Sequence, residues 1–182
     1  MNLRTWLESS RTRLDITAGV VDGILNALTL AAGRLLKPGA GADFSLAWRV
    51  GAATAVTTLF VFFVAHYAEL RADIVRAEKE LNLLSHGKLA ETALGRRAVL
   101  DALAGACLAA FCGLLGSMVP LLLCHFLPQP RWIGIVFTLG LLGLMGVILA
   151  RSVHGAASYW CAALVVGGIA LTWLGVRLDI TG

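Results

Sequence analysis

Charged residues are scarce in this chain. Only 14% of its 182 residues are Asp, Glu, Lys or Arg, whereas 58% are hydrophobic, and the mean hydropathy is +0.81. A soluble domain is usually about 45–50% apolar. The composition therefore excludes a sizeable soluble domain and indicates a polytopic membrane protein. The net charge of +4 lies at segment ends, where membrane topology requires it, and so gives no indication of nucleic-acid binding.

Cysteine pairs and catalytic motifs are also missing. The four cysteines contain no CxxC pair and all lie in apolar stretches, which is typical of small buried residues rather than of a redox or metal site. The four histidines form no tight ligand motif, and no Ser/His/Asp order or phosphate loop stands out. We therefore predict that the chain is not an enzyme and has no permanently bound cofactor.

Long apolar segments are what the sequence has in abundance. Five of them predict an all-α fold of membrane-spanning helices, at about residues 16–36, 46–70, 98–127, 132–150 and 156–177. Residues 1–14 are polar but amphipathic and predict a helix that lies on the membrane surface. The chain thus divides into this N-terminal segment and a five-helix domain over residues 15–182.

The strongest charge lies between the second and third apolar segments, in residues 71–97. We expect residues 71–86 to continue the second helix beyond the membrane, followed by a short loop. Ten of the 15 Lys and Arg residues lie in the N-terminal segment, in this central loop or at Arg151. Since positive residues favour the cytoplasmic side, both the N-terminus and the central loop are predicted to be cytoplasmic.

Asp22 is an acid inside the first apolar segment, in the stretch ITAGVVDGIL. A carboxylate that faces lipid costs about 2.5–3.5 kcal/mol, so an intramembrane acid usually faces inward and serves a function. Gly19 and Gly23 form a G-x-x-x-G pattern that permits close helix packing. Asn26 adds a polar group to the same face one turn later. The alternative is that Asp22 makes only a packing hydrogen bond.

Glu69 and His66 lie near the end of the second apolar segment. Because the first two spans are antiparallel, we expect Asp22 and Glu69 to lie at similar depth and to converge near the inner leaflet, with His66 on the same face. Carboxylate oxygens with one imidazole suit Fe²⁺ or Mn²⁺. The alternatives are that Glu69 reaches the interface beside Arg71 and that His66 is an ordinary packed histidine.

Four stretches, in the same order, resemble the vacuolar iron transporter family. AGVVDGILNALTLAAG at residues 18–33 resembles its first helix, and AHYAEL at 65–70 lies where the family has Met-Ala-x-Gly-Glu-Tyr. Residues 102–128, with Pro120 in a Val-Pro-Leu-Leu signature, are similar to its third helix, where Pro120 is expected in helix packing. Residues 146–178 resemble its last two helices. The resemblance rests on this ordered series.

The resemblance implies a homodimer with a metal path on its two-fold axis and export of Fe²⁺ from the cytosol against protons. It implies that Asp22 and Glu69 line this path, and a two-fold axis would bring two copies of each acid together. His66 stands where the family has methionine, and Ala68 where it has glycine, which bears on metal selectivity.

The central loop departs from the family pattern. A typical member has a cytoplasmic domain of three glutamate-rich helices between its second and third spans, but residues 71–97 are too short for one. Glu78, Glu80 and Glu91 are the candidates for cytoplasmic metal capture, and a solvated helix face is the alternative.

Together these features predict a divalent metal transporter that exports Fe²⁺ or Mn²⁺ from the cytosol. The alternative is a non-transporting scaffold, or a subunit that keeps the fold and binds a partner protein. We expect the protein to lie in membrane lipid, in a bacterial inner membrane.

Overall fold

The structure is a computed structural model that describes residues 10–36, 44–80, 93–126, 132–153 and 155–178. Within these ranges the chain is helical and contains no strand, which confirms the predicted all-α class. The helices are α2 (Ser10–Leu36), α3 (Phe44–Glu80), α4 (Ala93–Phe126), α5 (Trp132–Ser152) and α6 (Ala157–Leu178).

Four of the helices, α3 to α6, are long and apolar enough to cross a membrane. This supports an integral membrane protein. The described side chains of α2 cover residues 12–30 and include Arg13, Asp15 and Asp22, so α2 is the most polar of the five. That α2 also spans the membrane stays a prediction.

The helix bounds differ from the predicted ones at the start of the chain. α2 begins at Ser10, six residues before the predicted span. The last residues of the predicted surface segment therefore belong to α2, and residues 1–9 lie outside the described part. α3 runs without a break to Glu80 and α4 begins at Ala93. The rest of the predicted central loop lies outside the described residues.

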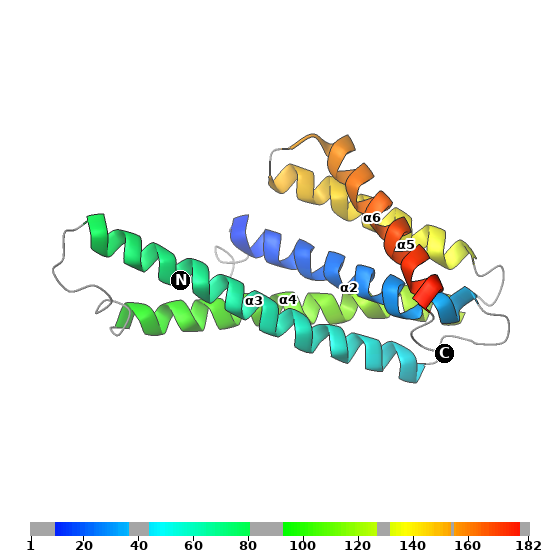
Figure 1. Cartoon of the computed structure of the whole chain (residues 1–182), viewed down its shortest axis with the longest axis horizontal. Coiled ribbons are helices and arrows are strands. Elements are labelled where there is room, and N and C mark those ends of the chain that lie inside the picture. Colours follow the sequence, from blue (N-terminus) through cyan, green and yellow to red (C-terminus); the bar gives the residue numbers. More distant parts are fainter. Residues whose placement is uncertain (1–9, 37–43, 81–92, 127–131, 154, 179–182) are drawn as a thin grey trace.

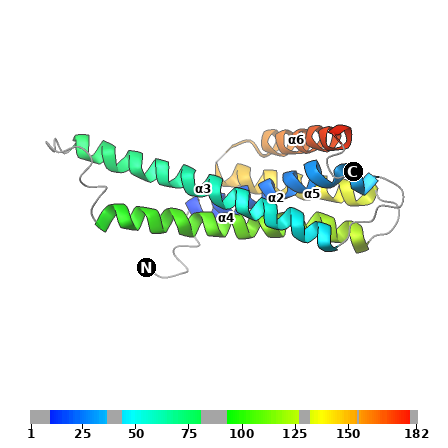
Figure 2. The ribbon, with the colours of Figure 1, turned by 60° about the horizontal axis from the view of Figure 1, so that its bottom comes forward.

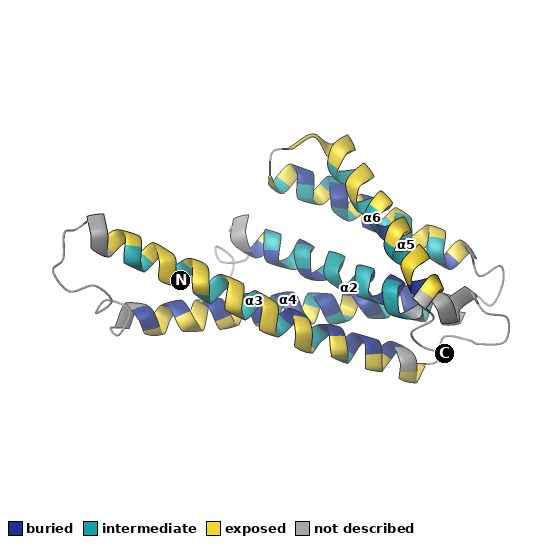
Figure 3. Cartoon of the chain, viewed as in Figure 1, coloured by how far each residue is buried: buried dark blue, intermediate teal, exposed yellow. Residues whose placement is uncertain are grey.

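α2 lies at the centre of the bundle, between α3 and α4 on one side and α5 and α6 on the other (Figures 1 and 2). Within residues 12–30 only Arg13 is exposed. In Figure 3, α2 is coloured almost entirely as buried or intermediate, whereas α6 is largely exposed. The most polar helix is thus the one that its neighbours cover best.

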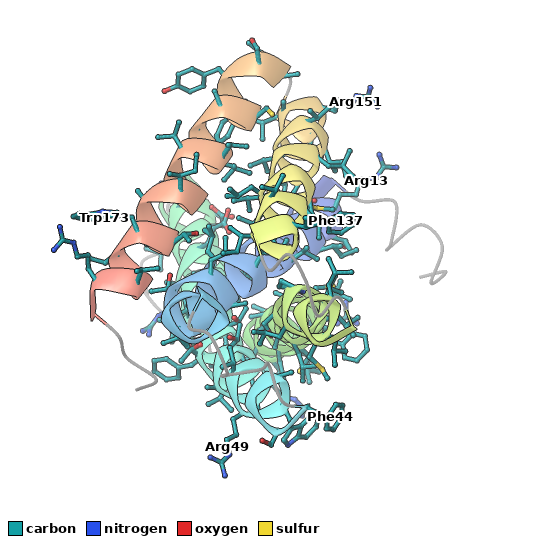
Figure 4. All side chains as sticks on the ribbon, turned by 90° about the vertical axis from the view of Figure 1, so that its right-hand side faces the viewer. Arg13, Phe44, Arg49, Phe137, Arg151 and Trp173 are labelled. Atoms are coloured by element: carbon teal, nitrogen blue, oxygen red, sulfur yellow. The ribbon has the colours of Figure 1, made fainter. Side chains whose placement is uncertain are left out.

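Large apolar side chains lie on the outside of the bundle. Those at least half exposed include Phe60, Phe111, Phe137, Val166 and Trp173, and Figure 4 shows Phe137 and Trp173 pointing away from the helices. The interior is instead rich in small or hydroxyl side chains. They include Ala27, Ala102, Ala106, Ala109, Thr54, Thr58 and Ser117. This is the reverse of a soluble protein and suits helices packed within lipid.

Glycine brings the backbones of α2 and α4 into contact. A Cβ atom added to Gly19 would lie 2.3 Å from the carbonyl oxygen of Ala109, and one added to Gly23 would lie 2.1 Å from that of Gly113. Four residues forward on α2 correspond to four residues forward on α4, so the two helices run parallel. The G-x-x-x-G pattern of α2 therefore faces α4, and larger residues could not occupy it without separating the helices.

Candidate functional site: a polar row between α2 and α3

Asp22 points from the central helix toward α3. The hydroxyl of Thr58 donates a short hydrogen bond to Oδ2 of Asp22, and Nδ2 of Asn26 donates to Oδ1 at 3.2 Å. Both carboxylate oxygens therefore have a donor. Asp22 is half-buried, and its interhelix contact lies within a single chain. The side chain is thus held by polar groups and not by lipid.

Asp15 forms a second polar contact between the same helices. Its Oδ1 lies 3.1 Å from Nε2 of His66, and the two side chains are only 9% and 13% exposed. The ring of Phe62 meets the imidazole edge-on, at 5.8 Å between centroids. A Cβ added to Gly105 of α4 would lie 3.0 Å from Nδ1 of His66 and 3.1 Å from Oδ2 of Asp15. Glycine at this position therefore leaves room for the pair.

These two contacts set the register between α2 and α3. From the Asp15–His66 contact to the Asp22–Thr58 contact, α2 advances by seven residues while α3 goes back by eight. The helices are therefore antiparallel. Seven or eight residues make about two turns, so the polar groups lie on one face of each helix, about 10–12 Å apart along the axis.

Thr54 lies at the next level of the row, four residues before Thr58 and, by the same register, opposite Asn26. It is 2% exposed. Its Oγ1 is the buried side-chain oxygen for which the described residues provide no hydrogen-bond partner. Leaving a buried hydroxyl unsatisfied costs about 1–3 kcal/mol. Such a group in a folded interior requires an explanation.

Other hydroxyls in the bundle donate to carbonyl oxygens of their own helix, usually four residues earlier. They are those of Thr17, Thr29, Thr57, Ser117, Thr138, Ser152 and Thr172. Thr58 and Thr54 do not follow this habit. We call the following six residues the polar row: Asp15, Asp22, Asn26, Thr54, Thr58 and His66.

The predicted convergence of Asp22, His66 and Glu69 is wrong within one chain. Asp22 faces Thr58, which is eleven residues, or about 16 Å along α3, from Glu69. His66 pairs with Asp15 instead, and Glu69 is exposed. The physical reason is the register, which places Glu69 level with residue 12 of α2. The described residues of one chain contain no group of three or more His, Cys, Asp or Glu side chains that could hold a metal ion.

The remaining predicted residues lie elsewhere. Pro120 is buried within α4. Glu78 and Glu80 belong to the last turn of α3, where the structure does not describe the side chains, and Glu91 lies outside the described residues. The prediction of cytoplasmic metal capture therefore stays a prediction.

Sequence reasoning missed Asp15, Thr54 and Thr58. Asp15 lies seven residues before Asp22, which is the spacing of two helical turns, but it follows the predicted surface segment so closely that it looked like a solvent-side residue. Threonines are common in apolar helices because their hydroxyls can bond to their own backbone. A usable signal was the spacing of Thr54, Thr58 and His66, which repeats every fourth residue and predicts one polar stripe.

The row offers hard ligands for a cation. Carboxylate, hydroxyl and amide oxygens are the groups that bind small divalent metal ions such as Mg²⁺, Ca²⁺ and Mn²⁺. The charge of Asp22 is attractive to a cation, and the apolar outer surface keeps that attraction from being fully screened by water. The arrangement can therefore hold a positively charged ion between α2 and α3.

Comparison with models of protein families, with curated proteins and with solved structures gives no match to this chain. The family resemblance therefore rests on the sequence stretches that carry it.

Proposed function

We propose that this chain is a membrane transporter that exports a divalent metal ion, Fe²⁺ or Mn²⁺, from the cytosol. One observation carries the proposal. The carboxylate of Asp22 lies in the central helix of an otherwise apolar bundle and faces another helix, held by Thr58 and Asn26. A buried acid in such a position is costly, and in membrane proteins it usually marks an ion pathway.

In this proposal the row provides the polar path. Asp15 and His66 form its level nearest the start of α2, and Asp22 with Thr58 forms the next. α2 crosses the membrane with its neighbours, the N-terminus is cytoplasmic, and metal moves outward in exchange for protons. The resemblance of residues 18–33 and 65–70 to the vacuolar iron transporter family supports this direction of transport.

A homodimer is part of the same proposal. Asp22 is half-buried and not sealed within its own chain, so a second copy related by a two-fold axis can add ligands to the path. The exposed Glu69 can contribute across such an axis even though it lies far from Asp22 within one chain.

The test is metal uptake by proteoliposomes that contain the full chain. The wild type is expected to accumulate Fe²⁺ or Mn²⁺, and Asp22→Asn is expected to lose nearly all transport while keeping the wild-type elution volume and thermal stability. Asp73→Asn is the matched control, because Asp73 is an exposed acid on α3 whose carboxylate lies 3.7 Å from Arg76. Unchanged uptake by a folded Asp22→Asn variant would contradict the proposal.

The alternative function is a non-transporting scaffold or a subunit of a larger complex. The lack of a three-residue metal cluster within the described part of one chain favours it. It predicts that wild-type proteoliposomes take up neither metal, and that the chain purifies at fixed stoichiometry with a second protein. Metal uptake by the pure homodimer would rule it out.

A further inference from the structure

We infer that Asp22, Asn26, Thr54 and Thr58 form an all-oxygen seat for a hard divalent cation within a single chain, which accepts Mn²⁺ in preference to a thiophilic ion such as Cd²⁺. This inference rests on the proposed function and names the ligands and the selectivity of its site. It replaces the predicted ligands His66 and Glu69 by hydroxyl and amide groups.

The centre of the seat is the Asp22–Thr58 contact. The Thr58 hydroxyl donates its hydrogen to the carboxylate, and its oxygen keeps lone pairs that can bind a cation at the same time. Nδ2 of Asn26 donates to the other carboxylate oxygen. That amide group also carries a carbonyl oxygen, which is a usual ligand of hard cations.

Thr54 supplies an independent observation. It lies one helical turn from Thr58 on the same face of α3, and its buried Oγ1 has no hydrogen-bond partner among the described residues. The neighbouring Thr57 shows what a threonine on α3 does by default, since its exposed hydroxyl donates to the carbonyl oxygens of Ala53 and Thr54. The Thr54 oxygen is not used in this way and is available to a ligand.

Gly113 of α4 keeps space open beside the two hydroxyl side chains. A Cβ at Gly113 would lie 3.3 Å from Oγ1 of Thr58, 3.3 Å from the carbonyl oxygen of Gly19 and 3.6 Å from Cγ2 of Thr54. Side chains from α3 and a main-chain oxygen from α2 therefore surround one small volume. Any side chain at position 113 would fill it.

The donor chemistry determines which ion fits. The four side chains present carboxylate, amide and hydroxyl oxygens, with no sulfur and no imidazole. Oxygen ligands select Mg²⁺, Ca²⁺ and Mn²⁺, whereas thiolate and thioether ligands select softer ions. Mn²⁺ is the member of the hard group that the proposed function already includes, so it is the probe we choose.

The test is Mn²⁺ binding to the purified full chain in nanodiscs, followed by the loss of the electron paramagnetic resonance signal of free Mn²⁺. Thr54→Val and Thr58→Val each remove a hydroxyl at nearly constant volume and are expected to weaken binding by about tenfold or more. Thr58→Ser keeps the oxygen and should bind as the wild type does. Thr57→Val is the matched control and should change nothing, since its hydroxyl is exposed and bonded to its own helix.

A gain-of-function variant tests the selectivity. Thr58→Cys places sulfur beside Asp22 and is expected to raise Cd²⁺ affinity by about tenfold or more while lowering that for Mn²⁺. Thr57→Cys should leave both affinities unchanged. This comparison does not depend on the stability of the valine variants.

The possible failures are distinguishable. If the wild type binds Mn²⁺ and Asp22→Asn abolishes binding, but folded Thr54→Val and Thr58→Val bind normally, the seat is overturned and the proposed function stands. A Thr58→Cys variant that gains no Cd²⁺ affinity also overturns the seat. If the wild type neither binds Mn²⁺ nor transports metal, the proposed function and the seat fail together.

Discussion

The three-helix unit α2–α3–α4 and the pair α5–α6 treat polar groups in opposite ways. In the pair, Thr138 and Thr172 donate to carbonyl oxygens four residues earlier in their own helices. The described cations of the pair, Arg151 and Arg177, are exposed in the last turns, and Figure 4 shows Arg151 directed away from the bundle. In the three-helix unit, polar side chains instead meet across helices.

This difference shows where the fold carries groups that packing alone does not require. An apolar helix pair needs no buried acid, and the α5–α6 pair has none among its described residues. α2 has two acids, Asp15 and Asp22, and each has a partner on α3. The cost of these groups is confined to one unit, which is therefore the place to look for function.

Backbone contact gives the largest predicted effect. Gly23→Ala places Cβ against the carbonyl oxygen of Gly113, at 2.1 Å before relaxation, so α2 and α4 must separate. We expect a loss of about 3 kcal/mol, or roughly 6–12 °C in Tm for a chain of this size, measured by thermal unfolding in detergent. Gly167→Ala in α6 is the control, since no atom lies within 4 Å of its added Cβ. Equal Tm values would show that the contact between α2 and α4 is not as close as described.

Breaking the pair at the start of the row comes next. Asp15→Ala leaves a largely buried imidazole without this carboxylate and should cost about 1–3 kcal/mol. A double-mutant cycle with His66→Ala should show that the two changes are not additive. Arg76→Ala, which removes an exposed ion pair with Asp73, should cost under about 1 kcal/mol. Additive effects in the cycle would mean that the two side chains do not interact.

The smallest effect separates the two kinds of threonine directly. Thr58→Val removes a donor from Asp22 and should cost about 1 kcal/mol, because interhelix hydrogen bonds in membrane proteins contribute about 0.6 to 1.7 kcal/mol. Thr138→Val removes a hydroxyl that bonds only to its own backbone and should be nearly neutral. Unfolding midpoints of the two variants, measured side by side, check this. A larger loss for Thr138→Val would reverse the comparison between the two regions.

The helical class and four membrane-compatible helices follow from the sequence, because long apolar runs and the Pro128 and Pro130 break are local signals. The inward position of Asp22 also follows, because a carboxylate against lipid is too costly. These conclusions depend on composition and on the energetics of a single residue. They do not require knowledge of which residues face each other.

The partners of Asp22 and His66 depend on register, and no local pattern determines it. Each residue of error along a helix moves a side chain by about 1.5 Å and 100°. α2 begins at Ser10, six residues earlier than expected, which brings Asp15 into the bundle. That single difference places His66 opposite Asp15 and leaves Asp22 to Thr58.

The glycines have one more consequence, for how this bundle can move. α2 touches main chain on two sides, at Gly19 against Ala109 and at Gly175 against the carbonyl oxygen of Thr29, whereas Gly51 of α3 meets only the side chains of α4. Helices whose backbones touch must travel as one body, while those joined by side chains can tilt. Any alternation between inward-open and outward-open states would therefore be a rocking of α3 over a fixed frame, and each cycle would remake the hydrogen bond between Thr58 and Asp22.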